Sequence, residues 1–299
     1  MSRPPSGEQW AIAAGDSRAV LVESGGGIRE YVAGGRAVLD GYAVEEMCTG
    51  GAGQVLAPWP NRVRDGRWSW RGRDQQLALS EPTAGNAIHG LVRWRPWTLV
   101  TRTADAVCVQ CQIDPQPGYP GSILVEIAWS VSAQGLRAAH SARNTGSEPA
   151  PFGLGVHPYL MVPGVAVDDL WLEIPAGTAL RTDERGLPVE EYPVAGSAVD
   201  YRAGRQIGAA KLDTAFTGGV SSARLSTPDG AGVELSLDHG FAWMQVYTGD
   251  TLPPARRRRS VAVEPMTCPP DAFNSGRDLM VLEPGQNWSG SWTLRPLRP

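Results

Sequence analysis

The sequence predicts an all-β protein that folds as one large antiparallel β-sandwich, a single domain over residues 1–299. Three observations support this class. The chain contains 36 glycines and 25 prolines, a density that leaves little room for long helices and is typical of many strands joined by turns. No stretch has the pattern of a helix longer than two turns. No internal repeat and no linker divides the chain, and its 42% of hydrophobic residues suffice for a sizeable core.

Short strand-like runs, separated by turn signals, follow one another along the chain. RAVLVES (18–24) passes through three glycines into IREYVAGG, which predicts a hairpin. Residues 67–79 alternate around a turn near Gly72, and residues 223–237 form a hairpin that turns at Asp229-Gly230. Further strands are expected over 95–102, 106–113, 123–131, 136–144, 241–249, 260–265 and 289–296. In such a sandwich a ligand occupies a groove across one sheet, lined by residues that are far apart in sequence.

Charge and cysteine usage exclude several classes of protein. The net charge of −4 argues against nucleic-acid binding. Cys108 and Cys111 form a C-x-x-C, but they lie in the alternating strand AVCVQCQI, where positions i and i+3 point to opposite faces and cannot easily share a metal. The absence of a disulfide framework is consistent with a reducing cytoplasm. The chain has no apolar run of membrane-spanning length and no cleavable signal pattern, so we expect a cytoplasmic protein without a membrane partner.

Two residues have contexts that suit proton transfer. Glu264 lies at the end of the strand SVAVEP, where Pro265 holds it extended and partial desolvation would raise its pKa toward the range useful for a general base. The alternative is an edge-strand charge that deters aggregation. His157 lies in the apolar stretch FGLGVHPYL, and by local pattern alone a buried, hydrogen-bonded histidine is favoured.

Three further polar positions have contexts that suit recognition of a sugar. Arg62 follows Asn61 in APWPNRVRDGRW, and its planar guanidinium fork suits vicinal hydroxyls; the alternative is a surface loop in which Arg62 pairs with Asp65. His89 precedes Gly90 and two tryptophans in NAIHGLVRWRPW, and aromatic faces beside polar groups suit a sugar ring; it is otherwise a turn histidine. Asp213 in KLDTAF can accept bonds from sugar hydroxyls or cap a turn.

The run Arg256–Arg259 has two readings. A solvated loop is favoured, and the alternative is a phosphate site, because arginine clusters bind phosphates. Motifs for a dinucleotide loop, for acyl chemistry and for metal ligation are not found.

Taken together, these segments resemble the aldose 1-epimerase (galactose mutarotase) family. The matching stretches are PWPNRVRDGRW, NAIHGLVRWRPW, PGYPG, GVHPYL, KLDTAF, QVYTGD, AVEPMTCPPDAFNSG and LEPGQ, in the family's order. The resemblance implies a large β-sandwich with an open sugar cleft and catalysis without metal or other cofactor. It implies Glu264 as general base and His157 as general acid, with Arg62, His89, Asp213, Asn61 and Tyr159 binding the sugar.

The expected substrate is therefore a monosaccharide of the glucose or galactose type, and the expected assembly is a monomer or homodimer. The His157 acid must carry a proton, which a nearby carboxylate would stabilise, and His157 and Glu264 are expected on opposite sides of the C1–O5 bond of one sugar ring. Two rival functions remain: an epimerase of a phosphorylated hexose that uses the Arg256–Arg259 run, and a catalytically silent sugar-binding module on the same fold.

Overall fold

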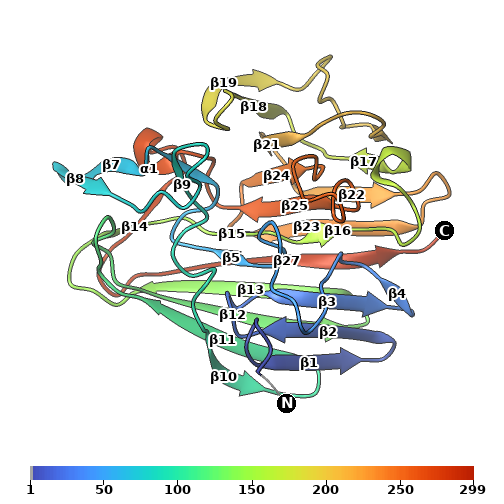
Figure 1. Cartoon of the computed structure of the whole chain (residues 1–299), viewed down its shortest axis with the longest axis horizontal. Coiled ribbons are helices and arrows are strands. Elements are labelled where there is room, and N and C mark those ends of the chain that lie inside the picture. The colour runs from blue at the N-terminus through green and yellow to red at the C-terminus, as the bar shows by residue number, and fades with distance from the viewer. Residues whose placement is uncertain (1–2) are drawn as a thin grey trace.

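The computed structural model describes residues 3–299 and confirms the predicted all-β class. Three large antiparallel sheets dominate the chain, joined by short ribbons and loops (Figure 1). Within the described residues, helical structure is limited to the single turn α1 (Ala272–Ser275) and the 3-10 turn η1 (Val167–Asp169). No helix in this part of the chain is both long and apolar enough to cross a membrane.

The largest sheet has nine strands, and its central strands are long and strictly alternating. Buried and partly exposed residues take turns along the strand that carries Cys108 and Cys111, so the two thiols point to opposite faces, as predicted. In order across the sheet the strands are β10 (Thr98–Arg102), β11 (Ala106–Ile113), β12 (Ile123–Ser132), β13 (Gly135–Asn144), β27 (Asn287–Leu297), β23 (Gly232–His239), β22 (Ser222–Ser226), β17 (Trp171–Glu173) and β20 (Arg205–Gln206).

Two further sheets share the apolar core with the nine-stranded sheet. The four-stranded sheet packs on β11 and β12 and consists of β1 (Gln9–Ala14), β2 (Ser17–Val22), β3 (Ile28–Ala33) and β4 (Arg36–Ala37). The eight-stranded sheet has the order β19 (Pro188–Pro193), β18 (Thr178–Thr182), β21 (Asp213–Thr217), β24 (Trp243–Tyr247), β25 (Val261–Met266), β15 (Gly155–Val156) and β5 (Val55–Leu56), with β16 (Tyr159–Leu160) also paired to β25.

Small two-stranded ribbons complete the fold. They are β6 (Arg62–Arg64) with β9 (Asn86–Ile88), β7 (Arg67–Trp70) with β8 (Arg73–Gln76), and β14 (Ala150–Phe152) with β26 (Met280–Leu282). The hairpins predicted at residues 18–33, around Gly72 and at Asp229-Gly230 are confirmed as β2–β3, β7–β8 and β22–β23.

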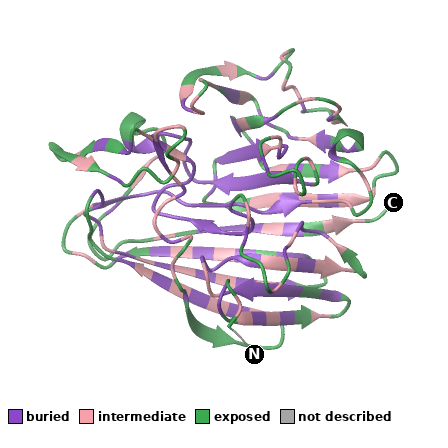
Figure 2. Cartoon of the chain, viewed as in Figure 1, coloured by how far each residue is buried: buried purple, intermediate pink, exposed green. Residues whose placement is uncertain are grey.

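A single continuous core joins the sheets. It contains Leu21 of β2, Trp129 of β12, Val263 of β25 and Leu294 of β27. The strand β25 is buried along its whole length, on both faces, which Figure 2 shows as continuous purple. One face of this central strand meets the core, and the other, which carries Glu264, forms the floor of a cleft. A carboxylate on this face is therefore desolvated by the fold itself.

Candidate active site

A cleft of about 270 Å³ lies over the eight-stranded sheet, between that sheet and the β6–β9 ribbon. It brings together every residue that the sequence singled out for the site: Asn61, Arg62, His89, His157, Tyr159, Asp213 and Glu264. A larger hollow of about 670 Å³ lies between the four-stranded sheet and the C-terminal residues, and contains none of them. The cleft is therefore the candidate active site.

The floor of the cleft is a pair formed by His157 and Glu264. The loop between β15 and β16 carries His157, and its backbone is fixed by bonds to Gln54 and Gly53: its N–H donates to the Gln54 carbonyl (3.1 Å), and its carbonyl accepts from the Gly53 N–H (2.9 Å). The imidazole Nε2 lies 3.4 Å from Glu264 Oε1, and the two side chains are only 6% and 3% exposed. The two residues that the resemblance implies as acid and base are thus in direct contact.

Burial shifts the two groups in opposite directions. It raises the pKa of Glu264 well above its usual range, helped by the negative charge of Asp213 and opposed by Arg62. It lowers the pKa of His157 to about 3. Moving charge out of water disfavours both ionised forms, so the empty pair is a protonated carboxyl facing a neutral imidazole. The prediction that His157 carries a proton concerns the acid step; in the protein without a sugar, burial favours the proton on Glu264.

The relative position of the pair limits where a sugar can lie. The two groups are in contact at 3.4 Å, so a whole sugar ring cannot lie between them; that they face opposite ends of the C1–O5 bond of one ring stays a prediction. They lie next to each other on the floor of the cleft and can reach two oxygens bonded to the same carbon. Tyr159 backs this pair: its ring stacks on the His157 ring with centroids 4.9 Å apart, and its hydroxyl donates to the Gly50 carbonyl (3.0 Å).

His89 and Asn61 lie together at the rim of the cleft, and each has a strained backbone. Both are non-glycine residues with positive φ, 63° and 54°, which is costly backbone that persists where surrounding structure enforces it. The His89 N–H donates to the Asn61 carbonyl (2.9 Å), and the Asn61 N–H donates to His89 Nδ1 (3.2 Å). Since Nδ1 accepts, the proton of the neutral ring is on Nε2. Burial holds the pKa of His89 well below its usual value, so this ring is a fixed hydrogen-bond donor rather than a proton carrier.

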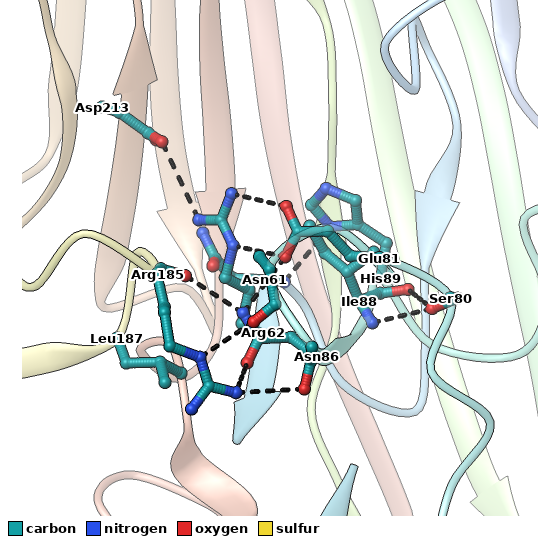
Figure 3. A network of polar contacts seen from close by, with 12 residues as sticks. Asn61, Arg62, Ser80, Glu81, Asn86, Ile88, His89, Arg185, Leu187 and Asp213 are labelled. Carbon is teal, nitrogen blue, oxygen red and sulfur yellow. Dashed lines mark hydrogen bonds and ion pairs between the residues drawn. The ribbon is translucent and has the colours of Figure 1, made fainter. Parts of the chain in front are cut away.

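Arg62 is held at the rim by a network of polar groups (Figure 3). Its guanidinium makes two bonds to the Glu81 carboxylate, at 2.9 and 3.0 Å, and lies 3.8 Å from Asp213. Asn86 donates to Glu81 (3.2 Å) and accepts from Arg185 (3.1 Å), which also binds Asp65 (2.7 Å). The alternative pairing of Arg62 with Asp65 is therefore wrong.

Asp213 is the most exposed of the predicted residues. It begins β21, and its carboxylate accepts a bond from the Gln245 side chain at 2.6 Å. Gln245 is the cross-strand partner of Glu264 and is buried beside it. The sequence reasoning did not identify Gln245, although its position in the matching stretch QVYTGD was a signal. Glu81, which fixes Arg62, has no recognisable signal, because it lies in an ordinary loop 19 positions away.

The Arg256–Arg259 run lies outside the cleft lining, and three of its members are paired. Arg256 and Arg259 reach Asp40 at 3.7 and 2.5 Å, and Arg258 pairs with Asp168 (2.8 Å) and Asp250 (2.9 Å). These arginines tie loops together. The run therefore offers no free cluster for a phosphate, and the solvated-loop reading holds only for Arg257, which has no carboxylate partner among the described residues.

The far wall of the cleft contains two residues that the sequence reasoning did not assign. Trp94 is 53% exposed and lines the opening. Arg93 is half-buried, lines the same wall and has its guanidinium 5.1 Å from the Trp94 ring centroid. Both belong to the stretch NAIHGLVRWRPW, where the alternation of cationic and aromatic residues was visible.

Known proteins resemble this chain in sequence and in fold. The family model for aldose 1-epimerase matches residues 8–295. The uncharacterized protein YihR of Escherichia coli K12 is 35% identical over 284 residues, covering 94% of this chain and 91% of that protein. In fold, the chain resembles the GalM/aldose epimerase homologue from C. elegans (TM-score 0.87, 18% identity, 97% and 99% covered) and galactose 1-epimerase from Lactobacillus acidophilus (TM-score 0.81, 19% identity, 96% and 94% covered).

Proposed function

The chain belongs to the aldose 1-epimerase family, and we propose that it interconverts the α and β anomers of a hexose by opening and reclosing the pyranose ring. The contact between His157 Nε2 and Glu264 Oε1, 3.4 Å apart at the floor of a sugar-sized cleft, is the observation that carries the proposal. Ring opening requires one proton to leave the C1 hydroxyl and one to reach O5. Because both oxygens are bonded to C1, two neighbouring groups can serve them together.

In the proposed reaction, Glu264 is the base and His157 the acid. The Glu264 carboxylate takes the proton of the C1 hydroxyl, the C1=O bond forms as the C1–O5 bond breaks, and His157 delivers its proton to O5. The open-chain aldehyde rotates about C1–C2, and O5 then attacks the other face of C1 while both protons return. The start and end states of the protein are identical, so each group must give and take a proton in every cycle.

The proton on Glu264 must therefore move to His157 before the ring opens. His157 Nε2 and Glu264 Oε1 are already in contact, so the proton passes directly from one to the other. The total charge of the site does not change. A sugar hydroxyl that donates to Glu264 favours its ionised form, and so does the positive charge of Arg62. Substrate binding is thus proposed to favour transfer of the proton from Glu264 to His157, which burial alone disfavours.

The remaining cleft residues are proposed to bind and orient the sugar. Arg62, whose Nη1 is not bonded to Glu81, offers a donor, and Asp213 offers an acceptor, for neighbouring hydroxyls at one side of the pair. His89 offers its fixed Nε2–H, and the exposed face of Trp94 suits the apolar C–H face of the ring. Holding the ring in one orientation is itself a rate effect.

Polarimetry of freshly dissolved α-glucose and α-galactose tests the proposal. The wild type should speed mutarotation beyond buffer of matched ionic composition, and Glu264→Gln should remove about 10²–10⁴-fold of that rate. Glu283→Gln, an exposed glutamate outside the cleft, is the matched control. Sugar binding with no rate enhancement would identify a silent binding module, and full activity of Glu264→Gln would refute the assigned base.

A further inference from the structure

Arg93 presents a half-buried positive charge to the cleft without a partner. Among residues 3–299, no carboxylate oxygen lies within 4.0 Å of the Arg93 guanidinium, and this group makes no hydrogen bond. Glu81 is the carboxylate whose charge acts on Arg93, but both of its oxygens are bonded to Arg62. Its one side-chain contact of note is the Trp94 ring. Charges withdrawn from water are normally paired, so an unpaired guanidinium in a ligand cleft marks a place for a negative group from outside.

The position of Arg93 is fixed by its backbone. The Arg93 carbonyl accepts a hydrogen bond from the buried Gln54 side chain at 2.6 Å. The same carbonyl packs against Gly25, where a side chain would place its Cβ only 2.6 Å from the Arg93 oxygen. The Trp94 ring holds the guanidinium at 5.1 Å. A cation fixed in this way loses little conformational freedom when it binds a ligand, which favours affinity.

We propose that the cleft takes an aldose with an anionic group on its exocyclic carbon, and that Arg93 binds this group. The inference rests on the proposed function and narrows its substrate class. Carboxylate, phosphate and sulfonate share the chemistry, since each presents two or more oxygens to a guanidinium fork.

The chemistry of ring opening places the exocyclic carbon on this side of the cleft. The proposed acid His157 must reach O5, and O5 is bonded to C5, which carries the exocyclic carbon. The C1 hydroxyl and the neighbouring C2 hydroxyl then face Glu264, on the side of Arg62 and Asp213. Arg93 lines the same cleft nearer to His157, since its charge is among the causes that lower the pKa of His157, whereas Arg62 and Asp213 act on the pKa of Glu264.

An anion at Arg93 would also assist the proton transfer. After burial, the positive charge of Arg93 is one of the causes that lower the pKa of His157 and of His89. A negative group that pairs with Arg93 cancels this repulsion, so His157 takes the proton from Glu264 more readily. Anionic aldoses should therefore have a higher kcat as well as a lower KM than neutral ones.

The test compares glucose with glucose derivatives that carry a carboxylate, a phosphate ester or a sulfonate at the exocyclic carbon. Rates are measured above each sugar's own rate in buffer, at constant ionic strength. For the wild type, kcat/KM for at least one anionic sugar should exceed that for glucose by about tenfold or more, as a charge-assisted bidentate contact implies. Equal values for glucose and all three anions would overturn the inference while leaving the proposed function intact.

Three variants assign the preference to a residue. Arg93→Gln should bring the ratio of anionic to neutral kcat/KM close to one, and Arg93→Lys should retain part of it, because lysine keeps the charge but not the fork. Arg257→Gln, in the arginine run outside the cleft, should keep the wild-type ratio. A preference that survives both Arg93 variants, or disappears in Arg257→Gln, overturns the assignment.

Binding separates this inference from the proposed function. If no sugar is turned over, the proposed function fails, and calorimetric titration of the same four sugars then decides the inference alone. Tighter binding of an anionic sugar that is lost in Arg93→Gln supports it, and equal binding of glucose and the anions overturns it. If the glutamine variant does not fold, Arg93→Lys is used instead, and a preference for the anionic sugar that is only partly reduced supports the inference, whereas an unchanged preference overturns it.

Discussion

Acidification is expected to remove the stability that the buried neutral histidines contribute to this protein. His157 lies in the cleft, and His140 lies in the core, where its Nε2 accepts a bond from Trp292 at 3.0 Å. Burial lowers the pKa of each imidazole from 6.5 to about 3, and His89 is shifted in the same direction. Below about pH 6.5 these histidines bind protons in the unfolded chain but stay neutral in the folded protein, so their contribution to the free energy of unfolding falls as pH falls.

The size of the effect follows from these shifts. At about pH 5 both His140 and His157 are still neutral in the folded protein, about 1.5 pH units below the unfolded pKa, which costs roughly 2 kcal/mol for each. Glu264 offsets part of this loss, because its raised pKa lets the folded carboxyl hold a proton that the unfolded one releases. The two histidines by themselves remove about 4 kcal/mol, and His89 adds to the same loss. That is a large share of the roughly 5–15 kcal/mol by which a typical protein is stable. The loss continues until pH falls through the folded pKa of about 3.

Urea unfolding at about pH 7.5 and about pH 5, followed by tryptophan fluorescence, measures this loss. The matched variant is His140→Gln, whose amide oxygen can still accept from Trp292 but does not titrate; its pH dependence should be smaller by about 2 kcal/mol over this range. A pH dependence unchanged in His140→Gln would refute the view that this imidazole is buried and neutral, since the total change between the two pH values also contains the opposing contribution of Glu264.

Three further predictions concern the cleft and the thiols. Glu81→Gln should weaken the two bonds that hold Arg62 and raise KM about tenfold with a smaller change in kcat; an unchanged KM in steady-state kinetics would show that Arg62 needs no such support. Tyr159→Phe should cost about 1 kcal/mol of stability in urea titrations, because the hydroxyl bond to Gly50 is lost; no loss would indicate that this bond contributes nothing. Burial raises the pKa of three thiols to about 11 and of the fourth to about 12, so native protein should react slowly with Ellman's reagent at about pH 8; Cys108 is partly exposed, and rapid reaction of the other three would contradict the burial of Cys48, Cys111 and Cys268.

The elements that the sequence predicted well are those with local causes. The alternation of AVCVQCQI and the turn signal Asp229-Gly230 depend only on neighbouring residues, and both formed the expected strand and hairpin. The site was found for a different reason: several short stretches, each weak alone, resemble one family in order. This is why Glu264 and His89 could be assigned to one cleft although 175 positions separate them (264 − 89).

The features that were missed depend on tertiary contacts. The protonation of His157 follows from how deeply the eight-stranded sheet buries it with Glu264, which no local pattern encodes. The partner of Arg62 is Glu81 rather than Asp65, because the β6–β9 ribbon brings a loop across the arginine. The arginine run pairs with acids as remote as Asp40, more than 200 positions away. Which side chain meets which charge is decided by the fold.

The most direct test of the account is a double-variant cycle on the proton-sharing pair. Mutarotation of an aldose, followed by NMR exchange between its α and β signals, is measured for the wild type, His157→Gln, Glu264→Gln and the double variant. Because the two groups share one proton and act as a unit, each single variant should lose about 10²–10⁴-fold in kcat/KM, and the double variant should lose little more. Single losses that multiply in the double variant, or a Glu264→Gln variant as active as the wild type, would contradict the account.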